Sequence, residues 1–278
     1  MANKYNTRDY KGKVSELLGS IHNTSVSTKI LQFMQKVKNN SDERYALRWI
    51  SELLQNTRDC SYKDQGVRIS IELTEDKLIY NHDSKPFRVK DILSLINQVT
   101  SKIEKNENED TTGKFGTGFM TTMLLSDSVR IISVLKDEDL PYKPFDIIID
   151  RSPDNSDGII EKINEAIHKL YQADIEKEIN DCNKNEYNTI FIYDLKNEKS
   201  KKAALIGIQN LIDTVHYIFS FSTKFENIKI ETNTVKKKYN IEFNREKSVK
   251  ISDNIEEIII KENQLLKRVL MFHLKDIY

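Results

Sequence analysis

Apolar side chains recur along much of the chain at the spacing of a helix with one buried face. The clearest case is residues 42–60, where Asp42 can cap the first turn and the apolar residues fall on one stripe: Tyr45, Leu47, Trp49, Ile50, Leu53 and Leu54. This spacing predicts an amphipathic helix. Similar patterns predict helices over residues 11–20, 26–38, 88–99, 119–125, 158–180 and 201–220.

Other segments alternate between apolar and polar residues, which is typical of half-buried strands. Residues 67–73 carry an apolar side chain at every second position, and a turn at Asp76 and Lys77 leads into a partner strand from residue 78. Further strands are expected over residues 129–135, 145–149, 189–195, 227–232 and 238–243. The last apolar stretches indicate the start of a further unit, as in the N-terminal piece of a longer protein; they are residues 258–260 and 265–270.

Helices that alternate with hairpin-joined strands predict an α/β sandwich whose sheet is mixed rather than purely parallel. We expect residues 1–197 to form the main domain. Residues 198–278, a helix followed by a β-hairpin, would begin a second α/β segment of a transducer-like or C-terminal kind.

Bulk composition favours a globular protein in a reducing compartment. The 278 residues include 43 Lys and Arg and 43 Asp and Glu, so no net charge draws the chain to nucleic acid or anionic lipid. Two cysteines, Cys60 and Cys182, without a secretory signal favour a cytoplasmic location. No apolar run approaches the roughly 18 residues of a membrane helix, so we expect no membrane partner.

A polar cluster lies on the predicted helix 42–60. Glu52, Asn56 and Asp59 stand at positions i, i+4 and i+7, so they project from one face. An Asn carbonyl oxygen suits Mg²⁺ as a hard ligand, and a glutamate one turn away can polarise a water. A solvated polar face would show the same spacing, so both interpretations stay open on this segment alone.

Two further segments carry candidate chemistry. Residues 81–87, Asn-His-Asp-Ser-Lys-Pro-Phe, close a strand and can aim a carboxylate or an imidazole at a bound base, although an ordinary turn has the same composition. The glycine-rich segment, residues 113–118, precedes a predicted helix; its glycines let backbone amides approach an oxyanion, and Lys114 adds a cation. Its spacing matches neither the dinucleotide fingerprint nor the P-loop, and by itself a flexible turn also explains it.

In this order and spacing, the segments make the chain similar to the GHKL superfamily of Bergerat-fold ATPases. That superfamily includes gyrase B subunits, heat-shock chaperones, histidine kinases and MutL proteins. The pattern Glu52-x-x-x-Asn56-x-x-Asp59 resembles its N-box, and residues 113–119 resemble its lid motif. The resemblance covers residues 40–195 and is nearest to divergent heat-shock-chaperone-like and sacsin-type ATP-binding domains.

Two more elements of the family are found, one of them altered. Residues 100–102, Thr-Ser-Lys, resemble a Ser-Lys element, and Thr189 opens a segment similar to the closing strand beside the adenine. The family's Asp-x-Gly-x-Gly adenine box is replaced by residues 81–87, which contain no glycine. Alignment puts His82 at the place of the adenine-reading aspartate, whereas the chemistry of an acceptor favours Asp83. We therefore expect Asp83 to read adenine, with His82 as the alternative.

The resemblance implies a Mg²⁺-dependent module that binds and hydrolyses ATP, in a two-layer sandwich whose largely antiparallel sheet is covered by helices on one face. Glu52 would deprotonate the attacking water, Asn56 would ligate Mg²⁺, and residues 100–112 would close as a lid. Asp59 would support the base or the pocket wall. The nucleotide-binding residues implied by the resemblance are Asn56, Asp59, His82, Asp83, Ser101, Lys102, Gly113, Lys114, Phe115, Gly116, Thr117, Gly118, Phe119 and Thr189.

The resemblance also implies partners. They are ATP, a second copy of the chain in a nucleotide-dependent homodimer, and a protein client, with bacterial defence as one setting. A nucleotide-binding switch with little turnover is an alternative, because the adenine box is altered. A MutL- or gyrase-like DNA-processing ATPase is another, and the zero net charge counts against it.

Overall fold

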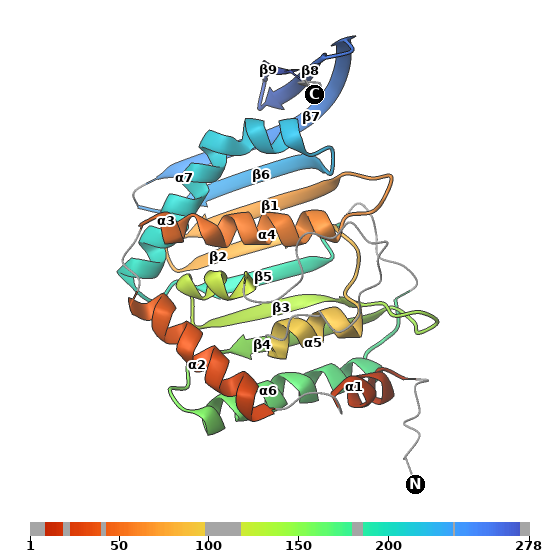
Figure 1. The fold of residues 1–278 in the computed structure, drawn as a ribbon, viewed down its shortest axis with the longest axis vertical. Helices are drawn as coiled ribbons and strands as arrows, with labels where there is room; N and C mark the ends of the chain where they lie inside the picture. Colours follow the sequence, from red (N-terminus) through yellow and green to blue (C-terminus); the bar gives the residue numbers. More distant parts are fainter. Residues whose placement is uncertain are drawn as a thin grey trace, which may run out of the picture.

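The computed structural model describes residues 9–18, 23–39, 43–97, 118–179, 186–235 and 237–272. They form an α/β fold around one nine-stranded sheet of order β4-β3-β5-β2-β1-β6-β7-β8-β9 (Figure 1). The pair β1–β6 is parallel, and every other neighbouring pair in this sheet is antiparallel. The predicted α/β class with a mixed, mostly antiparallel sheet is confirmed. The strands are β1 Val67–Thr74, β2 Lys77–His82, β3 Ser128–Leu135, β4 Lys143–Asp150, β5 Thr189–Asp194, β6 Phe225–Asn233, β7 Lys238–Ser252, β8 Ile255–Glu262 and β9 Leu265–Phe272.

The described helices are α1 Tyr10–Leu18, α2 Asn23–Asn39, α3 Glu43–Ala46, α4 Arg48–Asp59, α5 Val89–Asn97, α6 Ser156–Tyr171 and α7 Glu198–Phe221, with short 3-10 helices η1 Phe119–Leu124 and η2 Gln172–Asp174. In Figure 1, α4, α5 and α7 pass in front of the sheet. Trp49, Ile50, Leu53, Leu54 and Thr57 form the buried stripe of α4. Its apolar stripe therefore faces the core, as the spacing predicted. Among the described helices, none is long and apolar enough to cross a membrane.

Three predicted helices differ in the structure. The helix expected over 42–60 is divided at Leu47 into α3 and α4, and its expected cap, Asp42, lies outside the described residues. The segment expected over 119–125 is a 3-10 helix, because Thr121 and Thr122 donate their hydroxyl protons to Gly118 O and Phe119 O, each at 2.8 Å. Side-chain bonds of this kind compete with the α-helical ladder. The helix expected over 158–180 ends as an α-helix at Tyr171.

Trp49 joins α4 to α7. Its ring is fully buried, its Nε1 donates to Ala203 O at 3.1 Å, and a β-carbon at Gly207 would lie 2.4 Å from its Cε2. Since β6 also pairs with β1, residues on both sides of the predicted boundary after residue 197 share one sheet and one core.

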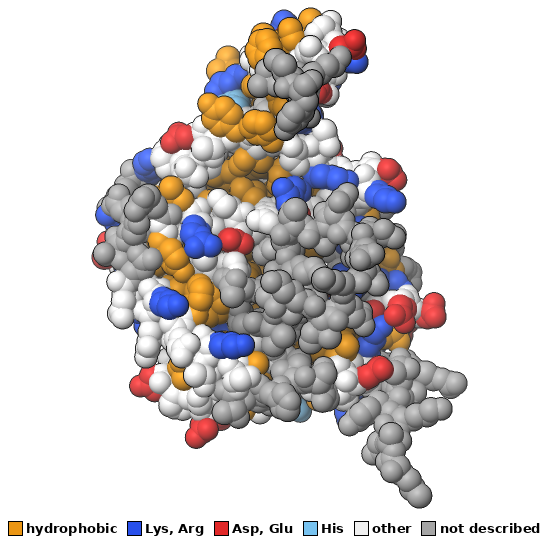
Figure 2. All heavy atoms as spheres, in the orientation of Figure 1, with side chains coloured by type: hydrophobic (Ala, Val, Ile, Leu, Met, Phe, Trp, Pro, Cys, Tyr) orange, Lys and Arg blue, Asp and Glu red, His pale blue; other side chains and the backbone are white. Residues whose placement is uncertain are grey.

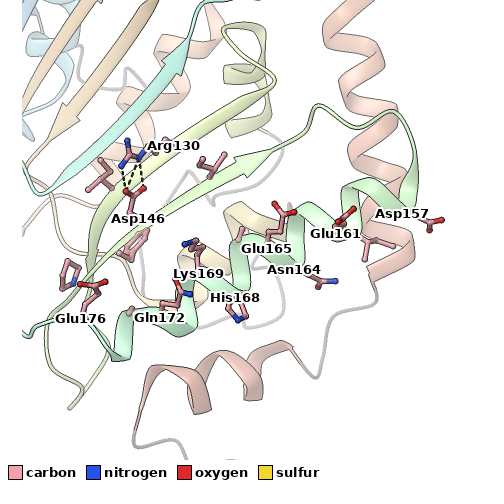
Figure 3. Close-up of a pocket in the computed structure, with 17 residues that line it drawn as sticks. Arg130, Asp146, Asp157, Glu161, Asn164, Glu165, His168, Lys169, Gln172 and Glu176 are labelled. Atoms are coloured by element: carbon pink, nitrogen blue, oxygen red, sulfur yellow. Dashed lines mark hydrogen bonds and ion pairs between the residues drawn. The ribbon is translucent and has the colours of Figure 1, made fainter.

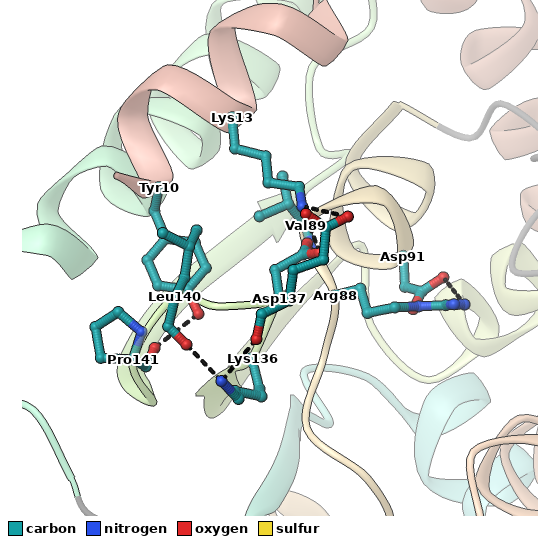
Figure 4. Close-up of polar contacts among 10 residues, drawn as sticks. Tyr10, Lys13, Arg88, Val89, Asp91, Lys136, Asp137, Leu140 and Pro141 are labelled. Carbon is teal, nitrogen blue, oxygen red and sulfur yellow. Dashed lines mark hydrogen bonds and ion pairs between the residues drawn. The ribbon is translucent and has the colours of Figure 1, made fainter. Parts of the chain in front are cut away.

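Asp137 anchors two helices to the loop between β3 and β4 (Figure 4). Its carboxylate accepts a hydrogen bond from Lys13 Nζ of α1 at 2.6 Å and from the backbone N–H of Val89, the first residue of α5, at 2.8 Å. The second bond satisfies an unpaired amide and places a negative charge at a helix N-terminus. The Tyr10 hydroxyl donates a hydrogen bond to Pro141 O at 2.8 Å. Helix α1 is therefore bonded to this loop near its start, at Asp137, and near its end, at Pro141.

The end of the sheet formed by β7, β8 and β9 projects from the rest of the described chain (Figures 1 and 2). Figure 2 shows hydrophobic side chains gathered there. They include Ile251, Leu266, Leu270 and Phe272, each more than half exposed. The stretches predicted to start a further unit thus form the last two described strands of the same sheet, and the surface of this part includes both these apolar residues and the Arg268–Glu257 ion pair.

Candidate functional site

Glu52 and Gly118, from the predicted N-box and the predicted lid motif, lie in direct contact. Glu52 stands on the middle of α4, and Gly118 immediately precedes η1. A β-carbon at position 118 would lie 2.0 Å from Glu52 Oε2 and 2.6 Å from its Cδ. Gly118 has ordinary helical angles, φ −62° and ψ −50°, so its backbone admits any residue, but a side chain at this position would displace the Glu52 carboxylate.

The three polar residues of α4 have different surroundings. The Glu52 side chain is 23% exposed, so water can reach its carboxylate, and Arg48 Nη2 lies 3.8 Å away. Asn56, one turn further, lines a cavity beside β2. The Asp59 carboxylate accepts hydrogen bonds from Arg58 Nε and Nη2 at 3.0 and 2.9 Å. Asn56 therefore lines the cavity, Glu52 lies against Gly118, and Asp59 is engaged by Arg58.

The cavity between α4 and the end of β2 has a volume of about 20 Å³. A volume of this size accommodates about one water molecule. A nucleotide base would therefore enter only after neighbouring groups move. The residues that line the cavity are Leu53, Asn56, Thr57, Cys60, His82, Ser84, Lys85, Pro86, Phe87, Asp91 and Phe191.

His82, the last residue of β2, faces α4. Side chains alternate along a strand, so His82 shares a face with Tyr80, whose hydroxyl is 2.9 Å from Thr57 Oγ1 of α4. Burial lowers the pKa of His82 to about 3, which keeps the imidazole neutral at pH 7. Its ring centroid lies 6.0 Å from that of Phe191, which supplies an apolar wall of the cavity.

Asp83 is turned toward β1. Its carboxylate, 1% exposed, accepts hydrogen bonds from the backbone N–H and the Nε of Arg68, both at 2.7 Å. Asp83 does not line the cavity between α4 and β2. Of the two candidates for base recognition, the structure brings His82 to the cavity with Asn56 and binds Asp83 to Arg68.

Thr189 of β5 is the direct cross-strand neighbour of His82 in the antiparallel β2–β5 pair. Its buried hydroxyl is 2.7 Å from Ser133 Oγ and donates to Asn188 Oδ1 at 3.2 Å. The Asn188 amide nitrogen in turn donates to Ser84 O at 2.8 Å. Thr189 thus lies beside His82, the candidate for base recognition, and its hydroxyl is hydrogen-bonded to Ser133 and Asn188.

Sequence reasoning missed several contributors to this site: Arg68, Ser84, Phe191 and the Thr57–Tyr80 pair. Phe191 could have been found, because it stands two residues after Thr189 on the same face of a predicted strand. Arg68 could not, since its contact with Asp83 depends on the pairing of two strands. Phe119, predicted to contact nucleotide, is buried with its ring centroid 5.9 Å from that of Phe191.

The remaining predicted residues lie outside the described residues. They are Ser101, Lys102, Gly113, Lys114, Phe115, Gly116 and Thr117, together with the predicted lid at 100–112.

Among the polar residues of α4, Asn56 offers an oxygen ligand that suits Mg²⁺ bound to a nucleotide. Within the described ranges, no group of three or more His, Cys, Asp or Glu side chains could hold a metal ion. Mg²⁺ bound to a nucleotide needs few protein ligands, because phosphate oxygens and waters fill most positions. Asn56, with an oxygen ligand beside the cavity and Glu52 one turn away, suits that arrangement.

A larger groove lies elsewhere, between α6 and the outer strands β3 and β4 (Figure 3). Its volume is about 1240 Å³, and none of the residues predicted to bind nucleotide lines it. The Arg130–Asp146 ion pair lies on its strand side, and Glu161 and Glu165 of α6 line the other. It is a surface groove lined by both apolar and charged side chains, separate from the cluster around α4.

Comparisons with known proteins do not assign the chain: no protein-family model matches it, and no curated protein matches it. What is known of the candidate site therefore comes from its own residues, above all the approach of Glu52 to Gly118 and the shared cavity of Asn56 and His82.

Proposed function

We propose that this chain is a Mg²⁺-dependent module that binds and hydrolyses ATP, with a Bergerat fold in two layers. The observation that carries the proposal is the contact between Glu52 and Gly118. Two motifs far apart in sequence, each typical of a nucleotide site, meet at a partly exposed carboxylate. If Glu52 were only part of a solvated helix face, its contact with Gly118 would not be expected.

The proposed nucleotide lies between α4 and the glycine-rich segment. Asn56 holds the Mg²⁺ ion, and His82 and Phe191 surround the base. Lys114 and the backbone amides that follow it would hold the phosphates, as the resemblance of residues 113–119 to the lid motif implies. When held by Asn56, Mg²⁺ would supply positive charge that offsets the negative charge of the phosphates.

In the proposed reaction, Glu52 accepts a proton from a water molecule. The water oxygen attacks the γ-phosphorus, and the bond from that phosphorus to the β–γ bridging oxygen breaks. ADP and inorganic phosphate are the products. Two observations support this role for Glu52: water reaches its carboxylate, and Gly118 limits the position of that carboxylate.

We further propose that the module acts in the cytoplasm. Its nucleotide state would control lid closure, homodimerisation or action on a protein client. These steps follow from the resemblance of the motifs and from the proposed ATP site.

The test is a thermal shift with millimolar ATP, with and without Mg²⁺, followed by a steady-state ATPase assay. We expect ATP and Mg²⁺ together to raise the melting temperature, and Asn56→Ala to remove the part that depends on Mg²⁺. Glu52→Gln should bind ATP while turnover falls by about 100-fold. Glu161→Gln, an exposed glutamate of the separate groove, is the matched control and should change neither quantity. No stabilisation of the parent protein by ATP would refute the proposal.

A nucleotide-binding switch with little turnover is the second candidate. Two observations favour it: a neutral histidine lines the cavity where the family has an aspartate, and the cavity is small. A single-turnover experiment with γ-labelled ATP separates the candidates. Stoichiometric retention of uncleaved ATP over hours supports the switch, whereas release of labelled phosphate supports the ATPase.

A further inference from the structure

The hydrogen bonds of His82 define which of its ring nitrogens carries the proton. Its Nδ1 lies 3.4 Å from the backbone N–H of Ser84 and 2.8 Å from Ser84 Oγ. A backbone N–H can only donate, so Nδ1 is the acceptor and is unprotonated. Because burial keeps the ring neutral, the single proton is on Nε2. Within the described part of the chain, Nε2–H has no hydrogen-bond partner.

The carboxylates near His82 are already engaged. Both oxygens of Asp83 accept hydrogen bonds from Arg68. Asp91 is the carboxylate that lines the cavity, and its oxygens accept from Arg88 Nε at 2.7 Å and Nη2 at 3.2 Å. His82, a residue of the described cavity wall, therefore carries a hydrogen-bond donor with no partner among the described residues. The acidic residue of that wall, Asp91, is held by Arg88.

We propose that a purine, admitted when groups around the cavity move, is recognised through a ring nitrogen that accepts a hydrogen bond from His82 Nε2–H, and that its exocyclic amine is not read. An aspartate at this position would accept a hydrogen bond from the amine, whereas His82 Nε2–H donates one, so the direction of the hydrogen bond to the base is reversed. This inference rests on the proposed function, and it makes His82 the residue that determines base specificity.

The test compares dissociation constants of the wild-type chain for ATP analogues in the presence of Mg²⁺, by isothermal titration calorimetry. Purine riboside triphosphate lacks the exocyclic amine, and the 1-deaza, 3-deaza and 7-deaza analogues of ATP each replace one ring nitrogen by carbon. We expect loss of the amine to change affinity by less than about threefold, and one of the deaza analogues to bind about tenfold more weakly. In His82→Ala, that deaza analogue and ATP should bind equally.

The opposite pattern overturns the inference: a tenfold loss on removing the amine, with no effect of any deaza substitution. In that case ATP still binds, and the proposed function stands without this mode of base recognition. If ATP itself does not bind, both the proposed function and the inference are wrong. The wild-type series decides between these results even if His82→Ala fails to fold.

Discussion

The carboxylate of Glu52 and the backbone of Gly118 leave no room for a side chain between them, since a β-carbon at position 118 would lie 2.0 Å from Glu52 Oε2. The contact joins the middle of α4 to the residue that precedes η1. It makes the position of the proposed general base depend on the end of the glycine-rich segment.

Gly118→Ala should therefore impair hydrolysis by moving Glu52. A glutamate carboxylate is the far end of a flexible side chain, so the protein should fold with a melting temperature within a few degrees of wild type, while kcat falls at least tenfold. The double variant with Glu52→Ala tests the cause: its rate should equal that of Glu52→Ala alone. A further loss in the double variant would mean that Gly118 acts independently of Glu52.

Gly207→Ala should destabilise the protein although alanine favours helix. Helix propensity alone predicts a gain of about 1 kcal/mol, but the added carbon would lie 2.4 Å from the rigid ring of Trp49. Overpacking of this kind costs about 1–3 kcal/mol, so we expect a net loss in urea unfolding. Tyr217→Ala, at a side chain 62% exposed on the same helix, is the control and should cost less than about 0.5 kcal/mol. A stabilised Gly207→Ala would contradict the packing described for Trp49.

Asp83→Asn should cost stability and spare nucleotide binding. The change weakens the bonds from Arg68 to a carboxylate that is 1% exposed, and we expect a loss of about 1–3 kcal/mol in the free energy of unfolding. Nucleotide affinity, measured where the variant is fully folded, should stay within about threefold of wild type. Unchanged stability with lost binding would instead place Asp83 in the base site.

His82 should make stability depend on pH. Its pKa is lowered from 6.5 to about 3 in the folded protein, so below pH 6.5 the unfolded chain binds a proton that the folded chain does not. The stabilising contribution is complete above pH 6.5 and is lost progressively down to about pH 3. Between pH 6.5 and pH 5 the loss is about 2 kcal/mol.

The measurement is urea unfolding of wild type and His82→Gln at pH 7 and pH 5. Carboxylates titrate in both proteins, so the difference between the two proteins isolates the histidine. We expect the wild type to lose about 2 kcal/mol more than the variant. Equal losses would mean that the folded protein admits a proton at His82.

Much of the fold could be predicted from local pattern. The apolar stripe of α4 and the alternation in β1 are consequences of which face each element buries, and that information lies within a few neighbouring residues. The same spacing put Glu52 and Asn56 on one side of the helix. A candidate site could therefore be proposed before any tertiary contact was known.

The tertiary structure decided the contacts between residues far apart in sequence. It set Gly118 against Glu52 and Gly207 against Trp49, which no local period encodes. It also separated two adjacent residues with different roles: His82 lines the cavity, whereas Asp83 is held by Arg68. The physical reason is that a local pattern records burial, while the partner of a buried polar group is chosen by strand register and helix packing.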